Sequence, residues 1–164
     1  MLTLKIFAVV IVAVAMDLAL AHALELPGKL RLPKEQYLAV QAIYYPGFTF
    51  AGFTEPLGII LTALLAFLMP AGTPSFWLTV FACLALALMH AIYWVSIQPV
   101  NNFWLKDIGL QGAGKAFFAL GSISPARSGQ MDWTYLRDRW EYSHLARAVL
   151  AVAALVSLVT AVVE

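Results

Sequence analysis

Charged residues are scarce in this sequence: Asp, Glu, Lys and Arg make up 12% of the 164 residues, whereas they make up about a quarter of an ordinary soluble domain. Hydrophobic residues reach 62%, and the charges fall mainly between long apolar runs. So few charges cannot cover the surface of a soluble protein. We therefore expect one membrane domain surrounded by a lipid bilayer.

The sequence lacks the residues that are characteristic of several functional classes. Cys83 is the only cysteine, which excludes an intrachain disulfide. The net charge of +1 comes without a Lys/Arg cluster, so we do not expect binding to nucleic acid. The chain has no Rossmann glycine fingerprint, P-loop or nucleophile elbow. We therefore expect neither a nucleotide cofactor nor a serine hydrolase.

Four long apolar stretches make up much of the sequence. They cover residues 2–24, 50–69, 76–97 and 145–163. Each is near the ~20 residues that a helix needs to cross ~30 Å of hydrocarbon. Backbone polar groups must be paired within each span, and runs this long and uniformly apolar are not typical of barrel strands. The sequence therefore predicts an all-α protein, a four-helix transmembrane bundle in which residues 1–164 form a single domain.

The connections between the apolar stretches predict the topology. Residues 70–75 form a Pro/Gly turn so short that the second and third helices must be antiparallel neighbours. The other two connections are long, carry most of the basic residues, and fall on one side of the membrane. The positive-inside rule puts them in the cytoplasm and both termini outside. Within the long polar and aromatic loop between the third and fourth helices, residues 131–142 are typical of a short interfacial helix that continues into the fourth span.

The N-terminus imitates a secretory signal, because an apolar run follows Lys5 and ends near the triplet Ala21-His22-Ala23. However, Asp17 and His22 interrupt the apolar core and the cleavage region. We expect this segment to be retained as the first helix.

Ionisable residues gather toward one end of the expected bundle. An Asp, Lys or Arg at the centre of a membrane helix costs about 2.5–3.5 kcal/mol on insertion scales, so each such residue needs a reason. Since helix direction alternates, one group of residues falls in the half next to the long loops: Asp17, His22, Glu25, Glu55, His90, His144 and Arg147. Helical bundles build metal and haem sites from facing side chains of this kind. The candidate ligands of iron, copper or zinc, or the surroundings of a haem, are His22, Glu25, Glu55, His90 and His144.

The same residues allow a simpler interpretation. His22, Glu25 and His144 lie near helix ends, where side chains reach the headgroups at little cost. No tight ligand motif such as Glu-x-x-His occurs. His90 is different, because it lies roughly 10 Å inside the hydrocarbon and cannot easily reach water. We expect His90 to have a functional role or to belong to a buried network.

Aromatic residues show a second asymmetry. All six tyrosines and four of the five tryptophans lie on the side of the long loops. An aromatic belt explains part of this, although a belt appears at both interfaces. The alternative is a pocket for a flat apolar ligand, such as a quinone, a polyketide ring or a porphyrin. Tyr44, Trp94, Asn101 and Trp140 are the residues that we expect to bind such a ligand.

Four patches resemble the anthrone-oxygenase-like family of four-helix integral membrane proteins. These patches are His22-Ala-Leu-Glu25, Gln41-x-x-Tyr44 with Phe48, Gln98-Pro-Val-Asn101-Asn102 with Trp104, and Arg139-Trp140-x-x-x-His144-x-x-Arg147. The resemblance implies oxygenation of a reduced aromatic, such as an anthrone, to a quinone, without a flavin or nicotinamide site.

The first functional hypothesis is therefore a membrane oxidoreductase that acts on a flat apolar aromatic or quinone-type molecule. His22, His90 and His144 are its candidate catalytic residues, either as metal ligands together with Glu25 or Glu55, or as general bases. Arg147, Asn101 or Asn102 would then stabilise a developing oxyanion.

Two alternatives remain at this stage. Arg147 is also placed to form a salt bridge with Glu55, Glu25 or Asp17 across the bundle. For the whole chain, the alternative is a non-enzymatic accessory subunit of a larger membrane protein complex. Small residues in the second and fourth helices would suit close packing against membrane protein partners.

Overall fold

The computed structural model describes residues 1–104 and 132–164, and all the regular structure in these ranges is helical. The elements are α1 (Leu2–Lys29), α2 (Lys34–Gln41), a 3-10 turn (Ala42–Tyr44), α3 (Gly47–Ala51), α4 (Thr54–Leu68), α5 (Pro74–Ile92), a π-helical segment (Tyr93–Ile97), α6 (Gln98–Trp104) and α9 (Trp133–Val163). The predicted all-α class is confirmed.

Four helical spans are long and apolar enough to cross a membrane. They are Leu2–Lys29, Gly47–Leu68, Pro74–Asn101 and Trp133–Val163. This confirms the predicted four-helix architecture, but the spans extend beyond the apolar runs because helices tolerate polar residues at their ends. In α1, for example, Lys29 Nζ lies 3.0 Å from a carboxylate oxygen of Glu25, one helical turn earlier.

The fourth span begins earlier than the apolar run because its polar N-terminal part is helical too. The Asp132 side chain accepts a hydrogen bond from the Thr134 backbone amide and caps α9. The helix then continues without a break to Val163. The interfacial helix expected over residues 131–142 is therefore, from Trp133 on, the beginning of α9. Most of the predicted polar and aromatic loop, residues 105–131, lies outside the described residues.

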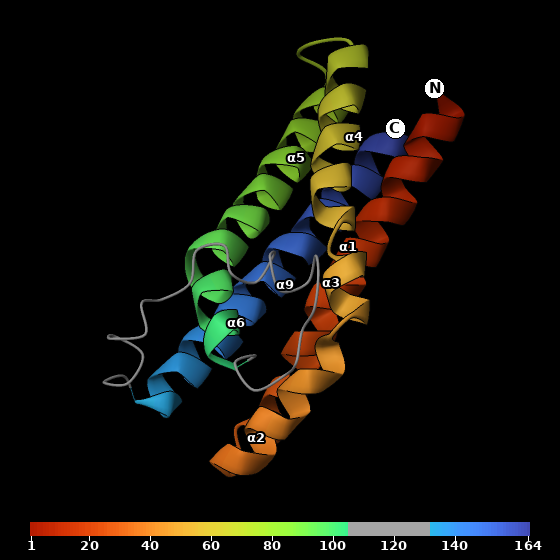
Figure 1. Ribbon diagram of the computed structural model, residues 1–164. Coiled ribbons are helices and arrows are strands. Elements are labelled where there is room, and N and C mark those ends of the chain that lie inside the picture. Colours follow the sequence, from red (N-terminus) through yellow and green to blue (C-terminus); the bar gives the residue numbers. More distant parts are fainter. Residues whose placement is uncertain (105–131) are drawn as a thin grey trace.

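The four long helices form a bundle in which α9 packs against α1 and α5, and α4 packs against the same two helices. Both termini lie at the same end as the α4–α5 connection, and α2 and α6 lie at the opposite end (Figure 1). Gly72, in that connection, has a φ of 84°, a conformation that glycine adopts without strain. The side of the membrane on which each end lies remains a prediction.

Many of the buried residues of α1 and α9, two helices that pack against each other, are small. Ala8, Ala15 and Ala19 of α1 are buried, as are Ala151 and several other alanines of α9. Small side chains let helices approach closely, which provides packing energy even where lipid surrounds the helices. Many of the large apolar residues point outward instead; Phe67, for example, is 84% exposed. This distribution is typical of a bundle whose outer surface contacts hydrocarbon.

A second cluster closes the end of the bundle near α2. Its buried members are Tyr37, Tyr44, Ile97, Val100, Leu136 and Trp140. These residues tie α2 and the 3-10 turn to α6 and to the first part of α9. Beside this cluster, the α5–α6 span contains the π-helical segment Tyr93–Ile97, and π-helical turns are frequent at functional sites. The first cluster is the main hydrophobic core of the bundle, which includes Leu65, Leu86 and Met89. The space between these two clusters is not completely filled.

Candidate functional site

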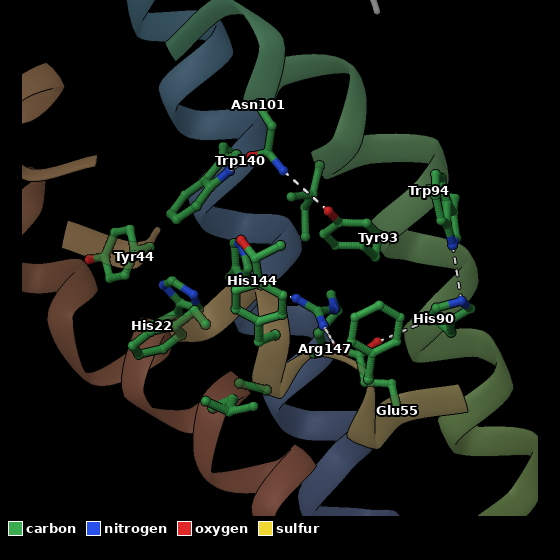
Figure 2. A pocket seen from close by; sticks show the side chains of 18 of the residues that line it. His22, Tyr44, Glu55, His90, Tyr93, Trp94, Asn101, Trp140, His144 and Arg147 are labelled. Atoms are coloured by element: carbon green, nitrogen blue, oxygen red, sulfur yellow. Dashed lines mark hydrogen bonds and ion pairs between the residues drawn. The ribbon is translucent and has the colours of Figure 1, made fainter. Parts of the chain in front are cut away.

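A cavity of ≈ 420 Å³ lies inside the bundle near this second cluster. Its volume falls in the range of about 300–1,000 Å³ that is usual for small-molecule sites. The predicted site residues that line it are His22, Tyr44, Glu55, His90, Trp94, Asn101, Trp140, His144 and Arg147. Glu25 is the one predicted site residue that does not line the cavity. Tertiary packing thus brings residues from all four spans and from the 3-10 turn to one place (Figure 2).

Polar groups form a continuous row along one wall of the cavity (Figure 2). Arg147 forms an ion pair with Glu55, which confirms the pairing expected from the sequence, and its Nη1 lies 3.0 Å from His144 Nδ1. The other carboxylate oxygen of Glu55 lies 3.2 Å from His90 Nδ1. Trp94 Nε1 lies 2.9 Å from His90 Nε2. The row therefore connects α9, α4 and α5.

The partners of His90 determine its tautomer. An indole nitrogen only donates, so His90 Nε2 accepts the hydrogen bond from Trp94 and carries no proton. The proton of the neutral ring is then on Nδ1, which donates to Glu55. Both nitrogens of His90 are occupied, and while these bonds hold, neither is available to a substrate.

The partner of His144 leads to the opposite tautomer. A guanidinium group only donates, so His144 Nδ1 accepts from Arg147 and the proton of the neutral ring is on Nε2. That Nε2 atom is buried and has no hydrogen-bond partner among the described residues. A buried N–H group without a partner is unfavourable. An acceptor oxygen on a bound ligand would satisfy it.

His22 lies against His144, and their ring centroids are 4.0 Å apart. His22 is 6% exposed and His144 is 4% exposed. His22 Nδ1 is also buried without a hydrogen-bond partner in the described part of the chain. The two rings come from α1 and α9, and each has one buried nitrogen without a hydrogen-bond partner among the described residues.

Aromatic rings surround this histidine pair. The His22 ring lies 4.5 Å from the Tyr44 ring, 5.0 Å from the Phe48 ring and 5.1 Å from the Trp140 ring, measured between centroids. The His144 ring lies 4.1 Å from Trp140. Such a shell excludes water and provides flat apolar surfaces against which an aromatic ligand can stack.

A second charged cluster, formed by Glu25, Lys29 and Glu141, lies behind the aromatic wall. Lys29 is 4% exposed, and its Nζ lies 3.0 Å from Glu25 and 3.6 Å from Glu141. The same ammonium lies 4.6 Å from the Tyr44 ring centroid and 4.8 Å from the Trp140 ring centroid. Lys29 was not among the candidate site residues predicted from the sequence, although its spacing of four from Glu25 is a signal for such a pair.

The tyrosines of α2 and the 3-10 turn complete this cluster. Tyr44 donates a hydrogen bond to Glu25, and Tyr37 donates one of 2.9 Å to Glu141. Burial, and then the hydrogen bond to Glu25, raises the pKa of the Tyr44 hydroxyl above its usual value. Tyr44 therefore stays protonated near neutral pH and can act as a hydrogen-bond donor.

No family model, curated protein or solved structure matches this chain. The resemblance to the anthrone-oxygenase-like family therefore remains a prediction based on the quoted residues.

The five candidate metal ligands do not surround one point. Glu25 pairs with Lys29, Glu55 pairs with Arg147, and His90 bonds to Glu55 and Trp94. Within residues 1–104 and 132–164, no group of three His, Cys, Asp or Glu side chains is placed to hold a metal ion. The metal or haem hypothesis and the general-base alternative both remain predictions.

Proposed function

We propose that this protein is a membrane oxidoreductase that oxidises a flat, apolar aromatic substrate with molecular oxygen. The observation that carries this proposal is the His22–His144 pair, which lines an aromatic cavity and has two buried nitrogens without a hydrogen-bond partner among the described residues. The resemblance to anthrone-oxygenase-like proteins supports the same reaction class.

His22 is the general base in this proposal. A neutral, buried imidazole can take a proton from an activated carbon, such as the methylene group of an anthrone. The electron pair of the broken C–H bond then moves toward the ring oxygen, which becomes an enolate. The His144 Nε2–H group donates to that oxygen and stabilises its developing charge.

Arg147 is a positioning residue, because its hydrogen bond keeps the His144 proton on Nε2 and its ion pair with Glu55 keeps the charge balanced. Oxygen is the oxidant. For an anthrone, the methylene carbon loses two hydrogens and gains one oxygen atom as a carbonyl, and the second oxygen atom leaves with both hydrogens as water.

Oxygen uptake and quinone absorbance, measured with anthrone on the purified protein in lipid nanodiscs, test this proposal. Protein-free nanodiscs correct for spontaneous oxidation. General acid–base groups contribute about 10²–10⁴-fold, so His22→Gln and His144→Gln should each lower kcat by about 100-fold or more. The matched control is Ser75→Ala, at the opposite end of the bundle, which should keep full activity.

Melting temperatures close to that of the wild type are needed to interpret the two histidine variants. Full activity in both variants would rule out the proposed base and donor. If the wild-type protein shows no turnover and instead purifies within a larger assembly, the accessory-subunit alternative is favoured.

A further inference from the structure

The cavity reaches the outer surface of the bundle between α3–α4 and α5. Three aromatic residues line the cavity and are also exposed: Phe50 and Phe53, each 65% exposed, and Trp94, 37% exposed. The side chain of His90, which is 32% exposed, lies at the same edge. The cavity is therefore open on one side, between two neighbouring helices.

This opening lies within the thickness of the membrane. Phe53 and Trp94 belong to the spans Gly47–Leu68 and Pro74–Asn101. At 1.5 Å per residue, Phe53 lies ~9 Å inside one end of its span, and Trp94 lies ~10 Å inside the end of its own span on the same side of the bundle. A molecule in front of the opening is therefore surrounded by lipid chains.

Polar groups are distributed in a way that fits a lipid-facing opening. At the edge, the Trp94 indole donates to His90, and His90 donates to Glu55. These groups satisfy one another, as hydrocarbon requires. The His22 and His144 nitrogens, which have no hydrogen-bond partner in the part of the chain that the structure describes, are buried instead. The polar groups at the outer edge of the cavity are thus paired with one another, whereas the inner end has polar atoms that a ligand could pair.

We propose that the cavity binds a membrane-dissolved aromatic ketone or quinone that carries an alkyl or prenyl tail, and that this ligand enters laterally from the bilayer. The ring oxygen accepts from His144 Nε2, the ring stacks among the aromatic side chains, and the tail leaves between Phe53 and Trp94. This inference rests on the proposed function for the identity of the site and adds the class of substrate and its route.

Photo-crosslinking in nanodiscs tests the route. The photoreactive residue p-benzoylphenylalanine replaces Phe53 at the opening, and replaces Phe67 in the matched control. Phe67 is in the same span and is 84% exposed, but does not line the cavity. The probe is decylubiquinone, and mass spectrometry measures the adduct. We expect the Phe53 adduct to saturate with probe concentration and to exceed the Phe67 adduct by at least tenfold.

Two further measurements test recognition of the ring. Decylbenzene, which has the same tail but no ring oxygen, should give only weak, non-saturating labelling at position 53. His144→Phe, which keeps an aromatic ring but removes the donor, should raise the half-saturating concentration of decylubiquinone at least tenfold. Saturable labelling by decylbenzene would overturn the proposed ligand class without depending on a variant.

Failure of this inference can be distinguished from failure of the proposed function. Equal labelling at positions 53 and 67 overturns the lateral route, even if anthrone is oxidised. Saturable labelling at position 53 without any oxidation of anthrone supports the binding site and its route, and contradicts the proposed reaction.

Discussion

Glu55 and Arg147 are charged residues that are buried within two of the candidate membrane spans. They are 6% and 5% exposed, and their ion pair lies in the wall of the cavity. A single unpaired charge at this depth would be strongly unfavourable, because few groups could replace its water shell. The pair also orients both neighbouring histidines, since Glu55 accepts from His90 and Arg147 donates to His144.

We therefore expect the pair to show strong coupling in a double-mutant cycle. Glu55→Gln and Arg147→Met should each lower the free energy of unfolding by about 3–5 kcal/mol, because each leaves a buried charge without its partner. The double variant should lose less than the sum of the two single losses. Unfolding in detergent micelles measures these values, and Arg31→Met, at an exposed position, is the control. Additive losses, or wild-type stability in both single variants, would contradict the coupling.

Helix α9 buries small side chains where it packs against its neighbours α1 and α5. Ala151 of α9 is fully buried, whereas Ala146 of the same helix is exposed. The histidine pair joins the same two helices, so the separation of α1 and α9 also determines the distance between His22 and His144. Close helix packing and the geometry of the site are therefore linked.

A larger residue in this contact should destabilise the bundle. Ala151→Leu adds three carbon atoms to a filled interface and should reduce stability by about 1–3 kcal/mol. The matched change Ala146→Leu adds the same atoms to an exposed position and should have little effect. Thermal unfolding of the two variants in the same detergent gives the comparison. Equal melting temperatures would show that the surroundings of Ala151 are not closely packed.

The two ends of the molecule differ in composition. The end with the termini has one short turn, while the opposite end carries α2, the Glu25–Lys29–Glu141 cluster and the cavity. Basic residues concentrate at that second end, and the positive-inside rule assigns it to the cytoplasm. A cavity near the cytoplasmic face with a lateral opening would receive ligands from the inner leaflet.

Cysteine labelling tests this orientation. In a Cys83→Ala background, Ala71→Cys marks the α4–α5 turn and Gln36→Cys marks α2; both positions are exposed. Ala71 is preferred to the neighbouring Gly72, whose positive φ disfavours other residues. A membrane-impermeant reagent added to intact cells should label position 71, and position 36 should react only after the cells are permeabilised. Labelling of both positions from outside would contradict the topology.

The number of spans, the helical class and the polar end of the bundle follow from the sequence alone. Spanning a bilayer depends on the summed hydropathy of about 20 consecutive residues and on backbone hydrogen bonding within the segment, and both are local properties. The pairing of Glu55 with Arg147 was also predictable, since few charges share that depth and an unpaired charge in the membrane is unfavourable.

Only the tertiary structure decided which side chains meet. The His22 and His144 rings lie in contact, whereas Glu25 pairs with Lys29 and does not line the cavity, although the sequence placed His22, Glu25 and His144 at the same end. The rotation of each helix about its axis determines these contacts. That rotation depends on how all the helices pack together, so the depth of a residue in the membrane does not reveal which neighbour it faces.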